Sequence, residues 1–256
     1  MCLSAVRRGL GRPLVLLHGW GSSSRAWRKL SVLLATQFQI TAFGLPGFGF
    51  SDPVEPVALG EISERLLRGI EGRFMILGWS LGGLMALEMA RRAPERVPGV
   101  MLIAANPCFI KRCGWPHALE ADVFESFAQN IAAAPARALK RFAVLQASNG
   151  AHRAEVIKAL QAAALWKVPQ SHVLLATLRL LSKSDMRDAL KGLNCPVAFV
   201  LGEQDPLVPV AIRNELTALA PRLRCYVVAG AAHAPFLSHP MQIAAYVREF
   251  LLCPKS

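Results

Sequence analysis

The chain has 256 residues, with a hydrophobic fraction of 53% and a charged fraction of 18%. This composition excludes a disordered chain, because disorder requires low hydrophobicity and high net charge, and the length is enough for one large core with an insertion. The formal net charge of +12 indicates an anionic partner, but without zinc-finger spacing, an aromatic RNA-binding strand or a long basic run we expect no nucleic-acid partner.

Short apolar runs rich in Val, Ile and Leu alternate with helical patterns, which is typical of a parallel sheet covered by helices on both faces. In chain order, the predicted strands span residues 14–17, 40–43, 74–77, 100–104, 197–201 and 226–228. The predicted helices span residues 24–36, 62–70, 81–92, 212–219 and 242–252. The sequence therefore predicts an α/β fold with a mostly parallel sheet flanked by helices.

The stretch from Cys108 to Arg187 breaks this alternation, because it contains helical patterns and no convincing strand. We interpret residues 108–187 as a helical cap inserted into the sheet domain. Residues 1–107 then form the first part of an α/β core, and residues 188–256 form its second part.

The chain carries no signal for a membrane or for secretion. The longest early apolar run, residues 14–17, is far shorter than the roughly 18 residues that a membrane span requires, and no cleavage site follows it. We therefore expect a monomeric, cytoplasmic protein without membrane contact. The six cysteines form no CxxC pair, and we expect reduced thiols and no metal site at Cys2, Cys108, Cys113, Cys195, Cys225 and Cys253.

Gly78-Trp79-Ser80-Leu81-Gly82 fits the pattern G-x-S-x-G between a predicted strand and a predicted helix. In α/β hydrolases this pattern forms a sharp strand-to-helix turn that exposes a nucleophilic serine above the sheet. The two glycines let the backbones pass closely there. We therefore predict the α/β-hydrolase fold with Ser80 as nucleophile, while the alternative is a glycine-rich turn with an incidental serine.

A serine hydroxyl is a weak nucleophile at neutral pH, so it needs a base and a group that orients the base. The chain order in α/β hydrolases is serine, acid, histidine, and two loops after predicted strands supply Asp205 and His233 in that order. We predict Asp205 as the orienting acid and His233 as the general base. The alternative acids are Glu203, Asp185 and Asp188, and the alternative bases are His18, His117, His152, His172 and His239.

The oxyanion that forms during acyl transfer needs two preorganised donors. The backbone N–H of Leu81 supplies the first by position, and the loop His18-Gly19-Trp20-Gly21 after the first predicted strand supplies the second from Trp20. The alternative for this loop is an ordinary tight turn. We expect His18 to hold the loop by a hydrogen bond, and we expect no metal or organic cofactor.

These motifs together resemble one family, the pimeloyl-[acyl-carrier protein] methyl ester carboxylesterases of biotin synthesis. The resemblance covers nearly the whole chain and rests on His18-Gly19-Trp20-Gly21, Leu45-Pro46-Gly47-Phe48-Gly49, Gly78-Trp79-Ser80-Leu81-Gly82-Gly83, Asn106-Pro107-Cys108-Phe109 and Ala231-Ala232-His233-Ala234-Pro235-Phe236. It implies hydrolysis of the methyl ester that caps a pimeloyl chain on acyl-carrier protein. Gly44 and the acid loop Gly202-Glu203-Gln204-Asp205 depart from the family pattern.

The resemblance also implies which residues contact the substrate and its carrier. The implied substrate contacts are Trp20, Ser80, Leu81, Phe142, Ala143, Val144, Leu145, Gln146 and His233. Because the carrier is acidic, basic residues of the cap are expected to bind it, namely Arg137, Arg141, Arg153 and Lys158. The alternative for these four residues is a solvated helix face.

Two other functions also fit the sequence. The same triad suits a broad short-chain carboxylesterase or lactonase, because fold and triad do not fix the substrate. A hydrolase fold can also serve as a non-catalytic ligand receptor. Turnover separates these hypotheses, since a receptor binds without steady hydrolysis and a general esterase ignores the carrier.

Overall fold

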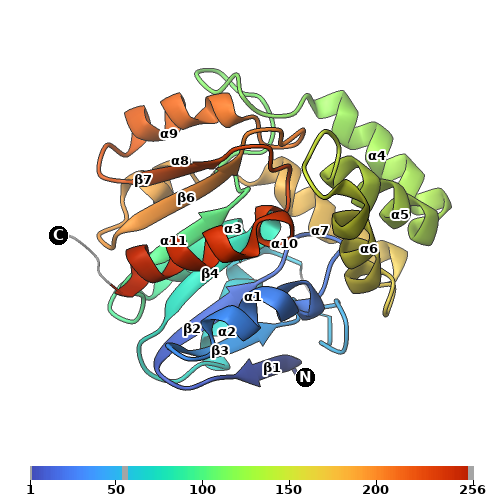
Figure 1. Cartoon of the computed structure of the whole chain (residues 1–256). Helices are drawn as coiled ribbons and strands as arrows, with labels where there is room; N and C mark the ends of the chain where they lie inside the picture. The colour runs from blue at the N-terminus through green and yellow to red at the C-terminus, as the bar shows by residue number, and fades with distance from the viewer. Residues whose placement is uncertain (1, 54–56, 253–256) are drawn as a thin grey trace.

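The computed structural model describes residues 2–53 and 57–252, and it shows one sheet with helices on both faces (Figure 1). Within these residues the sheet has seven strands: β1 (Ala5–Arg8), β2 (Arg12–Leu17), β3 (Phe38–Phe43), β4 (Met75–Trp79), β5 (Val100–Ile103), β6 (Val197–Gly202) and β7 (Arg224–Val228). Their spatial order is β1-β3-β2-β4-β5-β6-β7, and all neighbours pair in parallel except β1 and β3. The prediction of a mostly parallel α/β sheet is confirmed.

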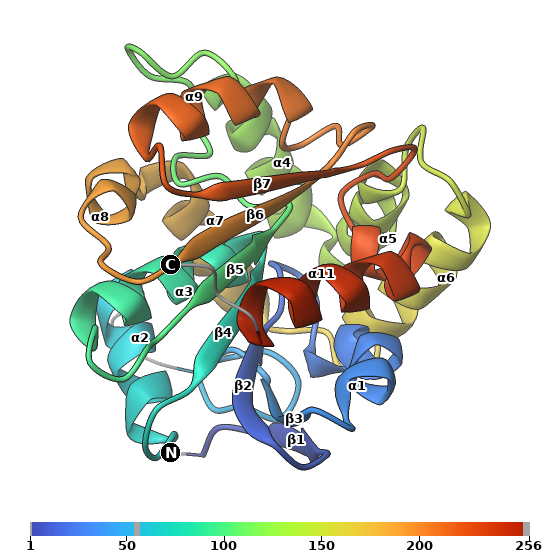
Figure 2. The same cartoon turned by 60° about the vertical axis from the view of Figure 1, so that its left-hand side comes forward.

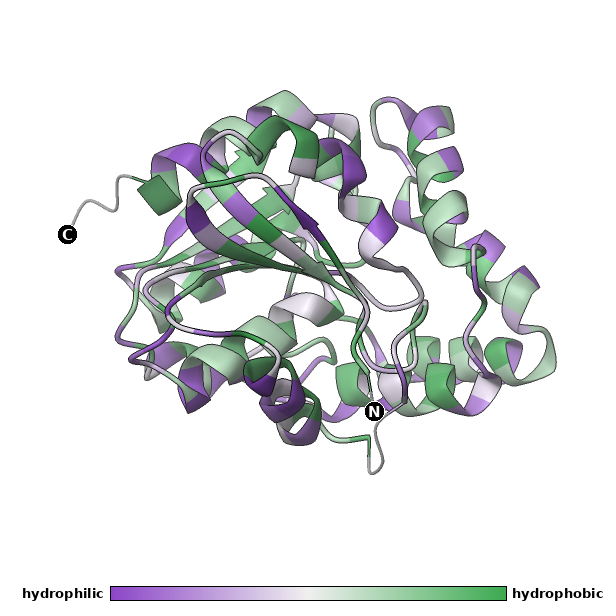
Figure 3. Cartoon of the chain, turned by 90° about the horizontal axis from the view of Figure 1, so that it is seen from below, coloured by the Kyte–Doolittle hydropathy of each residue, from purple (hydrophilic) through white to green (hydrophobic). Residues whose placement is uncertain are grey.

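The inner strand β2 is buried on both faces from Leu14 to Leu17, which explains its unbroken apolar run. Leu14 and Leu16 pack into the hydrophobic cluster on one face of the sheet, and Val15 and Leu17 pack into the cluster on the other face. Figure 3 colours the chain by hydropathy, and the helices around the sheet show both green and purple segments. A run without polar alternation is the pattern of a strand covered on both sides.

Two helical layers cover the sheet (Figures 1 and 2). One layer contains the 3₁₀ helix η1 (Ser24–Trp27), α1 (Arg28–Leu34), α10 (Pro235–Ser238) and α11 (Pro240–Leu252). The opposite layer contains α2 (Leu59–Arg68), α3 (Leu81–Arg92), α8 (Arg187–Lys191) and α9 (Arg213–Leu219), with the 3₁₀ helix η2 (Val210–Ile212) leading into α9. Both faces of the parallel sheet are thereby removed from water.

Five α-helices lie between β5 and β6 in the described part of the chain, and we call the first four of them the cap helices. They are α4 (Ala121–Ala133), α5 (Pro135–Gln146), α6 (Arg153–Ala164) and α7 (Ser171–Lys183), which gather on one side of the molecule in Figure 1. Ile131, Leu139 and Leu174 of these helices belong to the same buried cluster as Leu81 and Leu84 of α3. The cap helices therefore pack directly on the sheet domain.

The structure differs from the sequence prediction mainly near the N-terminus. Strand β1 was not predicted, because all four of its residues are exposed and show no apolar pattern. The predicted helix 24–36 is instead η1 followed by α1, which ends at Leu34. Helix α3 (Leu81–Arg92) has the predicted bounds, and all of its residues from Leu81 to Ala90 are buried.

Among residues 2–53 and 57–252, no helix is both long and apolar enough to cross a membrane. The cysteines in this part of the chain are free, namely Cys2, Cys108, Cys113, Cys195 and Cys225, while Cys253 lies outside the described residues. Burial raises the pKa of the Cys108 and Cys195 thiols, and it raises that of Cys225 to about 11. These three thiols therefore stay protonated at neutral pH.

Candidate active site

Ser80 stands at the sharp turn between the end of β4 and the start of α3. Its backbone has φ 53° and ψ −117°, a combination that costs a non-glycine residue energy and persists only where the surroundings enforce it. The Ser80 N–H donates to the Ile103 carbonyl over 3.0 Å, and the Ser80 carbonyl accepts the Gly83 N–H over 2.8 Å. These hydrogen bonds hold the strained turn that the G-x-S-x-G motif predicts.

The glycines on either side of Ser80 are required by close backbone contacts. A Cβ on Gly78 would lie 2.4 Å from the Gly82 carbonyl oxygen, and a Cβ on Gly82 would lie 2.2 Å from the Leu17 carbonyl oxygen. Because both obstacles are backbone atoms, a change of rotamer relieves neither contact. Leu17 is also the register partner of Gly78 in the parallel pair of β2 and β4, so the Ser80 turn lies directly beside the end of β2.

His233 and Asp205 meet in a buried, hydrogen-bonded pair. Nδ1 of His233 lies 2.9 Å from Oδ2 and 3.1 Å from Oδ1 of Asp205. Since a carboxylate only accepts, Nδ1 donates, and Nε2 is left as the basic nitrogen of the ring. Oδ1 of Asp205 also accepts the N–H groups of Leu207 over 2.8 Å and of Val208 over 3.0 Å. The loop after β6 therefore fixes the carboxylate that orients the imidazole.

The backbone of His233 is held from two sides. Its carbonyl accepts the indole N–H of Trp79 over 2.8 Å, and its N–H donates to the Gln146 carbonyl over 3.0 Å. Because Trp79 directly precedes Ser80, the indole ties the histidine loop to the nucleophile turn. Sequence reasoning missed this role, although a tryptophan inside a G-x-S-x-G motif signals a buried indole that needs an acceptor.

The second ring nitrogen of His233, Nε2, is buried and has no hydrogen-bond partner among the described residues. The hydrogen bond from the Ser80 hydroxyl is therefore not formed in this structure. In enzymes without substrate such bonds are often long, and they shorten when the substrate binds. Nε2 thus stays free to accept a proton.

The loop after β2 is fixed by the buried side chain of His18. Its Nδ1–H donates to the Gly19 carbonyl over 2.8 Å, and its Nε2 accepts the Leu45 N–H over 2.9 Å. Burial lowers the pKa of His18 to about 4, although the hydrogen bond to Gly19 acts in the opposite direction. The neutral ring therefore holds the loop as the sequence led us to expect.

The two predicted oxyanion donors lie in the loop after β2 and at the start of α3. The indole of Trp20 donates to the Leu174 carbonyl over 3.0 Å, whereas its backbone N–H has no acceptor within the described part of the chain. Leu81 is the first residue of α3, and a helix leaves its first N–H groups without an internal acceptor. Both N–H groups are therefore available to a ligand.

A cavity of about 100 Å³ opens beside Ser80, which is the only polar residue among those that line it. The apolar lining residues come from the loops after β2 and β6, the segment before α4, and the cap helices: Trp20, Phe109, Leu119, Val123, Phe124, Phe127, Phe142, Leu145, Leu178, Leu181 and Leu207. Val123 and Leu145 are 51% and 42% exposed, so they mark the mouth of the cavity. This lining favours an apolar ligand chain.

Helix α5 presents only part of the implied substrate segment to the cavity. Phe142 and Leu145 line it, whereas Ala143, Val144 and Gln146 are not among the lining residues. Ala143 and Gln146 are buried elsewhere, and Val144 is exposed. The helical period explains this division, since residues three apart share a face.

The alternative acids and bases have other surroundings. Glu203 and Asp188 are exposed, and Asp185 forms an ion pair with Arg187 over 2.7 Å. The remaining histidines are bonded elsewhere or face solvent: His117 contacts Glu215, His239 contacts Ser238, and His152 and His172 are exposed. In residues 2–53 and 57–252, no group of three or more His, Cys, Asp or Glu side chains could hold a metal ion.

The four implied docking residues lie on two cap helices that pack together. Arg137 and Arg141 are exposed on α5, and Arg153 and Lys158 are exposed on α6. No carboxylate of the described residues forms an ion pair with any of them. Through Glu155 and Ala159, α6 also borders a groove of about 720 Å³ whose other charged lining residues are Arg8, Arg25, Arg28 and Lys29. Free positive charge therefore extends from the cap helices toward α1.

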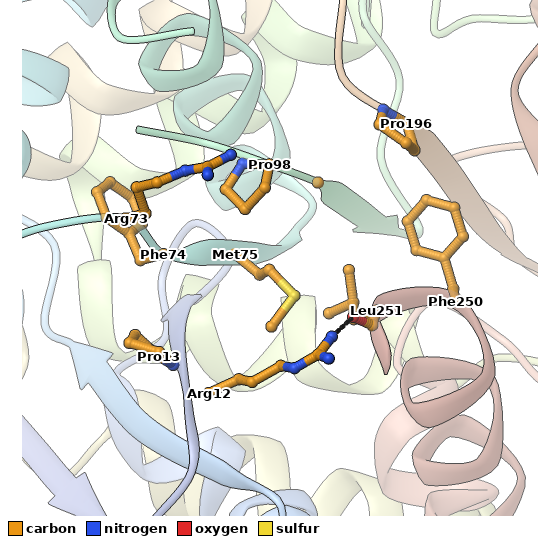
Figure 4. A pocket seen from close by; sticks show the side chains of 10 residues that line it. Arg12, Pro13, Arg73, Phe74, Met75, Pro98, Pro196, Phe250 and Leu251 are labelled. Carbon is orange, nitrogen blue, oxygen red and sulfur yellow. Dashed lines mark hydrogen bonds between the residues drawn. The ribbon is translucent and has the colours of Figure 1, made fainter. Parts of the chain in front are cut away.

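Another cavity, of about 260 Å³, lies at the opposite end of the sheet (Figure 4). Arg12 lies at its edge and donates to the Leu251 carbonyl over 3.4 Å, at the end of α11. None of the predicted site residues lines this cavity, and ligands of open α/β sheets bind outside the carboxyl ends of the strands. The cavity beside Ser80 is therefore the candidate active site.

Residues 14–246 match the alpha/beta hydrolase family. The solved esterase EaEST from Exiguobacterium antarcticum has a TM-score of 0.89 to this chain at 20% identity, covering 98% of this chain and 95% of that one. At this identity the likeness is one of fold. The Ser80 turn and the order of strands thus have the setting that the family requires.

Two curated relatives are more similar in sequence. The pimeloyl-[acyl-carrier protein] methyl ester esterase of Edwardsiella ictaluri (strain 93-146) is 38% identical over 240 residues, which cover 93% of each protein. The biotin biosynthesis bifunctional protein BioHC of Cellvibrio japonicus (strain Ueda107) is 36% identical over 93% of this chain and 47% of that protein. The chain therefore belongs to the alpha/beta hydrolase family and, within it, to the family of the pimeloyl-[acyl-carrier protein] methyl ester esterases.

Proposed function

We propose that this protein is a serine carboxylesterase that hydrolyses the methyl ester of pimeloyl-[acyl-carrier protein] to pimeloyl-[acyl-carrier protein] and methanol in biotin biosynthesis. The observation that carries the proposal is the strained Ser80 turn at an apolar cavity, with the buried Asp205–His233 pair tied to that turn through Trp79. The name and 38% identity of the Edwardsiella relative support the substrate. The free cysteines agree with a reducing compartment, and we place the protein in the cytoplasm as a monomer.

In the first half of the proposed reaction, the Ser80 oxygen attacks the carbonyl carbon of the methyl ester while Nε2 of His233 takes the hydroxyl proton. Asp205 holds the proton on Nδ1 and stabilises the imidazolium that forms. The N–H groups of Trp20 and Leu81 donate to the oxyanion. When the bond from carbon to the methoxy oxygen breaks, His233 returns the proton, so that methanol leaves and an acyl ester on Ser80 remains.

In the second half, water replaces methanol. His233 takes a proton from the water as its oxygen attacks the acyl carbonyl, and the same two N–H groups stabilise the second oxyanion. The bond to the Ser80 oxygen then breaks, and His233 gives the proton back to that oxygen. The net change is one water consumed, with one carboxylic acid and one methanol released.

The cavity also accounts for preference between the ester and its product. Its lining is apolar apart from Ser80. The methyl ester is neutral and enters without losing the hydration of a charge, whereas the pimeloyl carboxylate would lose its hydration and find no cation among the described residues of the cavity to pair with. Burying an isolated carboxylate costs several kcal/mol. The cavity therefore favours the capped chain and releases the free acid.

The exposed cations of the cap supply a contact for the carrier protein. Arg137, Arg141, Arg153 and Lys158 carry positive charge without an ion-pair partner among the described residues, and Arg141 is one helical turn before Leu145 at the cavity mouth. Charge complementarity of this kind raises the association rate with an acidic protein and makes it salt-dependent. In this proposal residues 108–187 serve as the cap that receives both the acyl chain and its carrier.

The test is hydrolysis of pimeloyl-carrier methyl ester by the wild-type protein and by Ser80→Ala, beside a free short-chain p-nitrophenyl ester, at low and moderate salt. We expect Ser80-dependent cleavage of the carrier ester that slows with salt. Cleavage of the free ester alone would leave the triad chemistry intact and refute the substrate. Binding without turnover of either ester would favour a receptor.

A further inference from the structure

The histidine loop, residues 230–233, is wedged between the cap helices and the end of β6. We infer that Gly150, in the segment after α5, is a positioning residue: the absence of a side chain there lets the cap segment 146–151 hold the His233 backbone in place. This inference rests on the proposed role of His233 as general base.

Two backbone hydrogen bonds join the cap segment to the histidine loop. The His233 N–H donates to the Gln146 carbonyl over 3.0 Å, and the Ala151 N–H donates to the Gly230 carbonyl over 2.7 Å. The bonds run in opposite directions and lie at the two ends of the loop. Segment 146–151 is therefore joined to the loop at both of its ends, and one of the two bonds is made by the backbone of His233 itself.

Gly150 lies between these two hydrogen bonds, where the chains approach closely. A Cβ on Gly150 would lie 2.8 Å from the Ala232 Cβ and 3.1 Å from the Ala232 nitrogen. Both atoms belong to or are bonded directly to the loop backbone, so the loop itself has to move to make room. The backbone of Gly150 is not in the left-handed region, so alanine can adopt its conformation. Only the steric contact with Ala232 opposes an alanine at this position.

The loop has no room on its other side. The Ala232 carbonyl oxygen would lie 2.3 Å from a Cβ on Gly202, at the end of β6, and the Gln204 N–H donates to the Ala231 carbonyl over 2.8 Å. Movement away from Gly150 therefore disturbs the strand end that leads to Asp205. A side chain on residue 150 would shift His233 relative to both Asp205 and Ser80.

In this arrangement His233 is placed correctly only when segment 146–151 of the cap packs closely against the histidine loop. A misplacement of about 1 Å at a reacting group can cost about 10²-fold in rate. We expect such a loss in kcat, with little change in KM, because Gly150 is not among the residues that line the substrate cavity. A residue with a purely structural role would lower stability without this division between kcat and KM.

The experiment compares Gly150→Ala with Gly99→Ala on a free p-nitrophenyl ester, with thermal unfolding measured in parallel. Gly99 is a matched control, because its Cβ would have an ordinary contact of 3.5 Å with Leu251 far from the site. We expect kcat of Gly150→Ala to fall about 10²-fold with KM changed less than about twofold, and Gly99→Ala to behave as wild type. An unchanged kcat in folded Gly150→Ala overturns the inference.

The double variant Gly150→Ala/Ala232→Gly moves the methyl group from the loop to the cap segment and removes the contact between the two Cβ atoms. We expect it to regain most of the lost kcat, and to regain the native fold if Gly150→Ala alone does not fold. A double variant that restores neither overturns the inference. Ser80→Ala is assayed on the same ester: turnover that persists there refutes the proposed function itself, whereas its loss beside a normal Gly150→Ala refutes only the role of Gly150.

Discussion

Nδ1 of His233 donates to both carboxylate oxygens of Asp205, at 2.9 and 3.1 Å, while Oδ1 of Asp205 also accepts two backbone N–H groups from its own loop. The carboxylate is held by three donors and is oriented before the histidine ever changes charge. Replacing this carboxylate with an amide changes the hydrogen bonds of the side chain but not the shape of the side chain. Such a substitution therefore tests the role of the Asp205–His233 pair.

Asp205→Asn is expected to lower kcat about 10³- to 10⁴-fold. The amide NH₂ facing Nδ1 would force the proton onto Nε2, so that the nitrogen meant to act as base would carry a proton. Steady-state hydrolysis of a p-nitrophenyl ester measures the loss. Glu203→Gln, in the same loop, is the control, and equal losses in the two variants would contradict the assignment of Asp205.

Gly82→Ala is expected to destabilise the fold by about 3 kcal/mol or more. The added Cβ would lie 2.2 Å from the Leu17 carbonyl oxygen, although alanine is otherwise the better residue inside a helix by about 1 kcal/mol. Urea unfolding of Gly82→Ala beside Gly99→Ala measures the difference. A gain in stability, as helix propensity alone predicts, would show that the close approach of α3 to β2 is wrong.

The stability of the protein is expected to fall between pH 6.5 and pH 4 because of His18. Its pKa is about 4 in the folded state and about 6.5 when unfolded, so the unfolded chain binds more protons in this window. The contribution of the neutral ring is fully present above pH 6.5 and is lost as the pH falls, amounting to roughly 3 kcal/mol. Denaturant titrations of wild type and His18→Gln at several pH values measure it, and a slope that survives the substitution belongs to another group.

Val123→Asp is expected to raise KM for esters with long acyl chains without lowering the melting temperature. Val123 lies at the mouth of the apolar cavity and is 51% exposed, so the carboxylate stays hydrated in the empty protein and loses water only when a chain enters. Met241→Asp, at a 66% exposed position on α11, is the matched control. If KM rises equally in both variants, Val123 does not lie at the entrance of the substrate cavity.

Reversing the charge of Arg141 and Lys158 to Glu is expected to raise KM for the carrier ester at least tenfold at low salt, while kcat/KM for a free ester stays constant. Loss of two attractive charges slows encounter with an acidic carrier, and salt weakens the difference. Arg73→Glu/Lys191→Glu carries the same change of net charge on exposed residues that do not belong to the cap helices. If this control loses as much activity, overall charge rather than the cap is responsible.

Much of the fold follows from local pattern, and what was missed depends on contacts between distant segments. The apolar run Leu14–Leu17 and the helix-forming residues after Ser80 are enough to predict β2 and α3, whereas β1 pairs only with β3 and buries none of its residues. The three residues of the proposed triad lie in short motifs, and each motif was recognisable in the sequence. Trp79 and Gln146 hold the backbone of His233 where the cap helices contact the sheet domain. Contacts between segments so far apart in the chain leave no pattern in the local sequence, so they could not be predicted.

The cap helices separate the proposed catalytic residues along the chain. Ser80 precedes them and both Asp205 and His233 follow them, and β6 takes its place beside β5 only after all four cap helices. Bringing the two ends of this long insertion together costs chain entropy, which the pairing of β6 and β7 with the sheet has to offset. A growing chain on the ribosome therefore contains the proposed nucleophile, Ser80, long before it contains the proposed base, His233. In the proposed mechanism esterase activity therefore needs the last part of the chain, and a chain truncated before β7, which lacks His233, is expected to hydrolyse no ester.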